Sequence, residues 1–190
     1  MSFDSSSPLL NTSDPNARVF SSSCFDFLLI ELVPMAERMA RDLATEGKDT
    51  EDEEVRETTF FRLESLGYRV GQGLAERFSR DRPRFTDNLD VIKFLCKDLW
   101  TVLFKKQVDN LKTNHRRVPA FWEDEYGSPE RCDIYGASSL IAYELTKYLW
   151  FPCGVIRGAL ANLGINTTVQ AETSDLPGAT FQIKTLQSRP

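Results

Sequence analysis

The chain has 190 residues, of which 41% are hydrophobic and 11% aromatic, so it is long and apolar enough to bury the core of one domain. Its formal net charge is −5. Seven carboxylates between Glu46 and Glu57 stand against two bases, so this segment accounts for the whole imbalance, and the balanced remainder argues against a general nucleic-acid-binding protein. We expect segment 46–57 to be a solvated acidic loop.

The four cysteines (Cys24, Cys96, Cys132 and Cys153) are isolated, with no C-x-x-C spacing and no secretory signal before them. This usage is typical of reduced thiols in a cytosolic protein. No apolar run approaches the roughly 18–20 residues that a bilayer-spanning helix needs. We therefore expect any membrane association to come through partners or a lipid.

Residues 1–23 are rich in Ser, Asp, Asn and Pro, a composition that predicts a flexible tail. The segment 24–43 then predicts the first helix of a single domain that covers residues 24–188. Its first half is apolar on nearly all sides, which indicates a helix enclosed by more than one surface. Part of the enclosing surface could belong to a second chain. Pro34 should kink it, and a strand over 25–33 is the alternative that its short apolar run leaves open.

The segment 60–114 predicts two helices joined by a basic turn. In the first, apolar residues recur at the spacing of one helix face, and Gly67, Gly71 and Ala75 form a second stripe of small residues. Glycine inside a helix costs on the order of 1 kcal/mol relative to alanine, so two of them indicate that another backbone comes close. The second helix should begin at Thr86 or Asp87, both good N-caps.

After residue 114 the pattern predicts a hairpin with strands at 118–122 and 131–135. A partly helical stretch at 137–149 follows, and then a helix at 151–163 with Pro152 in its first turn. A final hairpin is expected from 165–172 and 179–186, with one wet face. The fold class is therefore α+β, a helical layer packed on antiparallel β-hairpins in the order α-α-α-β-β-α-β-β.

The sequence predicts no catalytic, metal or cofactor site. His115 is the only histidine and has no neighbouring nucleophile or oriented acid, and the cysteines lack the spacing of zinc ligands. A modest basic patch is formed by Lys105, Lys106, Lys112, Arg116 and Arg117. The simpler interpretation is that cations are favoured near a helix C-terminus. The other interpretation is that the patch contacts an acidic partner or anionic lipid headgroups.

Three blocks of sequence resemble the Bet-three-like family of small TRAPP subunits: LESLGYRVGQGLAERF (63–78), DVIKFLCKDLWTVLFKKQVDNLKTNH (90–115) and CGVIRGALANLGI (153–165). The resemblance spans about residues 24–186. It implies a non-catalytic structural subunit of a vesicle-tethering complex. That complex acts as a guanine-nucleotide exchange factor for a Rab-type GTPase in ER-to-Golgi and Golgi transport. The implied location is cytoplasmic, peripheral at cis-Golgi and ER-to-Golgi membranes through the complex.

The resemblance also implies that the chain forms a heterodimer with the Bet-three subunit through its first two helices and contacts other TRAPP subunits. The implied partner-binding residues are Leu28, Leu29, Leu32, Ala36, Leu63, Gly67, Val70, Gly71 and Leu74. The Bet-three subunit of the family carries a fatty acyl chain on a cysteine shortly after the segment that matches 63–78. Segment 79–87 contains no cysteine here, so that modification is not transferred. The alternative function is a lipid- or small-molecule-binding module, since a helical layer on a sheet can enclose an apolar cavity.

Overall fold

The computed structural model describes residues 21–43, 51–105, 108, 110–113, 120–125, 139–173 and 178–186. Its helices are α1 (Ser22–Arg41), α2 (Glu51–Ser79), α3 (Asn88–Lys93), the π-helical segment η1 (Phe94–Leu99), α4 (Trp100–Phe104) and α5 (Ser139–Asn162). Its strands are β1 (Asn110–Thr113), β2 (Ala120–Glu125), β3 (Thr167–Glu172) and β4 (Gly178–Thr185). The order of helices and strands confirms the predicted α+β class, with α3, η1 and α4 forming one continuous helix.

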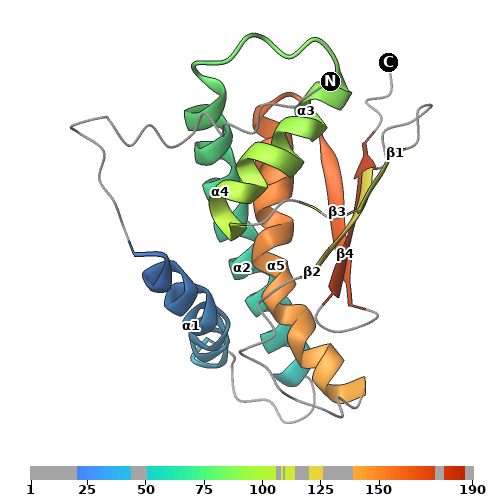
Figure 1. The fold of residues 1–190 in the computed structure, drawn as a ribbon. Coiled ribbons are helices and arrows are strands. Elements are labelled where there is room, and N and C mark those ends of the chain that lie inside the picture. The colour runs from blue at the N-terminus through green and yellow to red at the C-terminus, as the bar shows by residue number, and fades with distance from the viewer. Residues whose placement is uncertain are drawn as a thin grey trace.

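The four strands form one antiparallel sheet in the order β1-β2-β4-β3. Figure 1 shows α5 lying along this sheet, with α2 on the other side of α5 and α1 beyond α2. In β4, Phe181 and Ile183 point into the core and are buried, whereas Lys184, next to Ile183 in the strand, is exposed. The last hairpin therefore has one face in water, as its alternation of apolar and polar residues predicts. The helical layer therefore covers a single face of the described sheet.

The core is centred on α5. Val155, Ile156, Ala159 and Leu160 are each at most 1% exposed, and Phe181 of β4 contacts the ring of Trp100 edge-on at 5.4 Å between centroids. Full burial of one such aliphatic side chain contributes about 1.5–3 kcal/mol. The helix α5 therefore buries residues nearly all round its circumference and forms the centre of the described core.

Two element boundaries differ from the sequence prediction for identifiable reasons. The stretches expected as 137–149 and 151–163 form one helix, α5, with Pro152 inside it and not in its first turn. Proline removes one intrahelical hydrogen bond. The helix nevertheless continues, because Leu149 through Ile156 are all buried and the packing outweighs that loss.

The acidic segment 46–57 is also not a loop throughout, because residues 51–57 form the first turns of α2. Carboxylates near a helix N-terminus are stabilised by the helix dipole, which favours helix over loop for this run. The described helix of the central region ends at Phe104, where Lys105 takes φ 60, and residues 110–113 form β1 instead of continuing the helix to 114.

Other boundaries agree more closely. Asp87 caps α3 as predicted, accepting a hydrogen bond from the backbone N–H of Asp90 at 2.8 Å. Strand β2 overlaps the expected strand 118–122, whereas the expected strand 131–135, the tail 1–20 and His115 lie outside the described residues.

Candidate functional site

The helix α2 packs against α5 through one of its faces. This face carries Gly67 and Gly71. A Cβ atom added to Gly67 would collide with the carbonyl oxygen of Phe151, and one added to Gly71 with that of Val155. The two helices are therefore in backbone-to-backbone contact, which only glycine permits at these positions.

The contact is reciprocal. A Cβ on Gly154 would collide with the carbonyl oxygen of Glu64, and one on Gly158 with that of Tyr68. We refer to the contact made by Gly67, Gly71, Gly154 and Gly158 as the glycine seam. Beside it, Arg157 binds Glu64 through two donors, one of them Nη2 at 2.7 Å, and its guanidinium lies 4.5 Å from the centre of the Tyr68 ring. A bidentate pair of this kind fixes the rotation of one helix against the other.

The glycine seam corrects one part of the sequence interpretation. A second backbone does approach Gly67 and Gly71, but it belongs to α5 of the same chain. The space that these glycines leave is filled, so they have no surface to offer to a partner. The physical reason is that a stripe of small residues indicates that another backbone lies close, without indicating which backbone it is. The matching glycines, Gly154 and Gly158, each lie 87 residues after their counterparts Gly67 and Gly71, too far along the chain for a local pattern to connect them.

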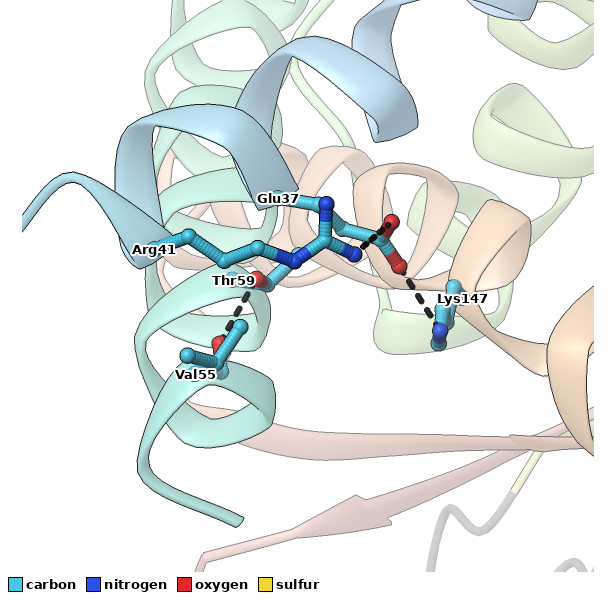
Figure 2. Close-up of polar contacts among 5 residues, drawn as sticks. All are labelled: Glu37, Arg41, Val55, Thr59 and Lys147. Atoms are coloured by element: carbon cyan, nitrogen blue, oxygen red, sulfur yellow. Dashed lines mark hydrogen bonds and ion pairs between the residues drawn. The ribbon is translucent and has the colours of Figure 1, made fainter. Parts of the chain in front are cut away.

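The helix α1 is fixed to the body through one face. Leu32, Val33, Ala36 and Ala40 are each at most 5% exposed. Figure 2 shows Glu37 of α1 between two bases, Arg41 of the same helix at 3.3 Å and Lys147 of α5 at 2.7 Å. The side chains of Glu37 and Lys147 are 19% and 16% exposed, so this ion pair is largely removed from water and holds α1 against α5.

One edge of this packed face of α1 exposes large apolar residues. Leu28, Met35 and Met39 are 54%, 39% and 44% exposed. Because an α-helix has about 3.6 residues per turn, these three positions fall on one stripe, which we call the α1 stripe. Phe27 and Ile30 expose further apolar surface on the first two turns. Soluble chains rarely leave a row of large apolar side chains like the α1 stripe uncovered unless another molecule binds there.

The nine predicted partner-binding residues thus separate into three groups. Leu28 is exposed on the α1 stripe; Leu29, Val70 and Leu74 are partly buried against the core; and Leu32, Ala36, Leu63, Gly67 and Gly71 are buried within the chain. Sequence reasoning missed Met35 and Met39 as site residues. Their spacing from Leu28, seven and eleven positions, is the signal that could have found them.

Two of the cysteines in the described region, Cys96 and Cys153, are buried and unreactive. Burial raises the pKa of the Cys96 thiol to about 12, and burial together with the nearby Glu64 charge raises that of Cys153 to about 12. Both thiols stay protonated at neutral pH and are poor nucleophiles. Among the described residues there is no group of three side chains placed to hold a metal ion, and no described helix is long and apolar enough to cross a membrane.

A depression between α5 and the sheet is lined by Ile92, Leu160, Ile165, Thr167, Ile183 and Thr185, and it leaves no room even for a water molecule. This depression therefore gives the lipid-binding alternative no support. The feature that distinguishes the described surface is the uncovered apolar side of α1.

The chain thus combines an α+β fold, with a helical layer on one antiparallel sheet, and a row of exposed apolar side chains on α1. Comparison with known proteins identifies its family. The family described as transport protein particle (TRAPP) component matches residues 25–186, so the chain belongs to this family.

Individual relatives agree with the family assignment. Trafficking protein particle complex subunit 6B of Mus musculus is 49% identical over 123 residues, which cover 64% of this chain and 75% of the relative. Subunit 6A of Homo sapiens is 42% identical over 123 residues, covering 64% and 74%. The crystal structure of a trafficking protein particle complex subunit 3 from Naegleria fowleri, covalently bound to palmitic acid, has a TM-score of 0.63 at 15% identity and covers 88% of this chain and 98% of that one. At that identity the likeness shows a shared fold.

Proposed function

We propose that the chain is a structural, non-catalytic subunit of a TRAPP vesicle-tethering complex. In this proposal the assembled complex acts as the guanine-nucleotide exchange factor for a Rab-type GTPase in ER-to-Golgi and Golgi transport. The chain itself contributes binding surface. It is cytoplasmic and reaches cis-Golgi and ER-to-Golgi membranes peripherally, through the other subunits.

Within the complex, the chain forms a heterodimer with the Bet-three subunit through the outward side of α1 and α2. The observation that carries this part is the α1 stripe, since Leu28, Met35 and Met39 expose apolar surface although the adjoining face of the same helix is closely packed. Membership of the TRAPP component family supports an assembly role. Burial of large apolar anchors at the centre of an interface is the usual source of binding energy.

The predicted set of partner residues changes accordingly. Leu28 stays in it, with Leu29, Val70 and Leu74 at its border, and Met35 and Met39 are added. Leu32, Ala36, Leu63, Gly67 and Gly71 support the surface from inside the chain instead of contacting the partner.

The proposal is tested by co-expression with the Bet-three subunit, followed by size-exclusion chromatography with light scattering. We expect a 1:1 complex for the unchanged chain. The variant Leu28→Glu/Met35→Glu/Met39→Glu should bind about 100-fold more weakly or not at all, because three apolar anchors become charged. Its circular dichroism spectrum should stay unchanged, since all three side chains are already largely in water.

A matched control is Leu89→Glu/Leu111→Glu/Leu186→Glu, which places the same three charges on apolar residues that are 36%, 38% and 57% exposed and lie outside α1 and α2. This variant should pair normally. An unchanged chain that remains monomeric beside the Bet-three subunit would contradict the proposed pairing, and so would a triple variant that binds as tightly as the unchanged chain.

A further inference from the structure

The arginines of the described region divide into paired and unpaired groups. Six of them form ion pairs with carboxylates: Arg38 with Glu31, Arg41 with Glu37, Arg56 with Glu53, Arg80 with Glu76, Arg82 with Asp98, and Arg157 with Glu64. Four others, Arg62, Arg69 and Arg77 of α2 and Arg84 beyond it, have no carboxylate within ion-pair distance among the described residues. The Nε of Arg62 is moreover enclosed, with no hydrogen-bond partner in the described part of the chain.

Arg62 and Arg69 lie on one side of α2. They are seven positions apart, which is nearly two full turns, so both point the same way. Gly67 and Gly71 point toward α5, and helical periodicity places Arg62 and Arg69 on the side of α2 turned away from it. The fully buried Leu63 lies between these two directions on the helix.

The α1 stripe lies on the same side of the helix pair. Glu37 reaches Lys147 of α5, which establishes the flank of α1 that is turned toward α5. Leu28, Met35 and Met39 fall on the other flank. Figure 1 shows α1 and α2 running side by side in opposite directions. Helical periodicity puts the apolar row of α1 and the two arginines of α2 on the sides of these helices that are turned away from α5.

We propose that Arg62 and Arg69 select the partner of this face by charge, and that the partner is a protein helix with an apolar ridge flanked by carboxylates. The inference rests on the proposed function and specifies the chemistry of the surface that binds there. Apolar contacts with the α1 stripe supply area, while the two guanidiniums receive carboxylates in bidentate geometry. Charge complementarity of this kind fixes the register of two surfaces and raises the rate at which they meet.

An acidic protein helix fits this face better than an anionic membrane does. The end of α2 that lies beside the C-terminal part of α1 carries Asp52, Glu53, Glu54 and Glu57, and the whole chain has a net charge of −5. A negatively charged bilayer would be repelled by that end of the same helix pair. A folded partner can place its carboxylates opposite the arginines alone and avoid the acidic end.

The test is the affinity of Arg62→Glu/Arg69→Glu for the Bet-three subunit, measured by calorimetry at low and high salt. We expect binding at least 10-fold weaker than that of the unchanged chain at low salt, with part of the loss recovered at high salt, because the reversed charges repel the partner's carboxylates and salt screens this repulsion. The control Arg84→Glu/Lys184→Glu makes the same change in net charge at two exposed sites off this face and should bind normally. Arg62→Gln/Arg69→Gln, which adds no new charge, should fall between them.

Each outcome decides between the two proposals. If the unchanged chain binds the Bet-three subunit and the double reversal binds equally well, the arginine inference is overturned and the proposed function stands. If the unchanged chain does not bind at all, the proposed pairing fails and this inference with it. If the double reversal keeps its partner but loses binding to phosphatidylserine vesicles, or loses only self-association of this chain in sedimentation, the arginines serve a membrane or a second copy and the inference is wrong. Equal thermal midpoints for all variants would show that folding is not the cause.

Discussion

The two faces of α2 show how differently a chain can use one helix. On the face toward α5, four glycines bring two backbones into contact and a bidentate ion pair flanks them, so the interface is complete within the chain. On its outward side α2 carries Arg62 and Arg69, which have no ion pair among the described residues, and the neighbouring α1 exposes the apolar α1 stripe. The difference teaches that small residues mark an interface already satisfied, whereas large exposed apolar residues mark one still to be made.

Substitution in the glycine seam should cause the largest loss of stability. Gly71→Ala and Gly158→Ala each place a Cβ on a backbone carbonyl that cannot move without separating α2 from α5. We expect the free energy of unfolding to fall by about 3 kcal/mol or more per substitution, at the upper end for overpacking. Urea denaturation followed by circular dichroism measures it.

Gly73→Ala is the matched control for the seam. Gly73 lies in the same helix with open space around its Cα. Alanine there should stabilise the chain by roughly 0.5–1 kcal/mol because it is the better helix former. A seam variant as stable as the unchanged chain would show that the two helices do not meet through backbone.

Disruption of the ion pair between α1 and α5 should give an intermediate effect. Lys147→Met leaves Glu37 largely buried and with Arg41 as its remaining base, which we expect to destabilise the chain by about 1–3 kcal/mol. Hydrogen exchange should rise over Ser22–Arg41 more than over α5. The double variant Glu37→Gln/Lys147→Met should recover part of the loss, and uniform exchange along the chain would argue against a local role in holding α1.

Ionisation of the buried thiols should have the smallest effect on stability at neutral pH. The pKa values of Cys96 and Cys153 are raised to about 12 by burial, so their contribution to stability is fully present below about pH 9, the ordinary thiol value, and is lost as pH rises toward 12. Alkylation at pH 8 mapped by mass spectrometry should modify the exposed Cys24 much faster than Cys96 or Cys153. Equal rates would mean that the core opens readily.

Several features were accessible from the sequence because they are local. The apolar periodicity of α2, the N-cap at Asp87 and the alternation in the last hairpin each depend on residues only a few positions apart. Pro152 was misleading for the same reason, since local rules place proline in a first turn whereas buried neighbours on every side carry α5 through it.

The sequence by itself determined the α+β class, the order of elements and the presence of close backbone contact at Gly67 and Gly71. Only the tertiary structure decided that the contact is with Gly154 and Gly158 of α5, and that the α1 stripe is Leu28, Met35 and Met39. The physical reason is that periodicity reports which residues share a face of a helix. Which body covers that face depends on contacts between segments far apart in the chain, and no local pattern encodes them.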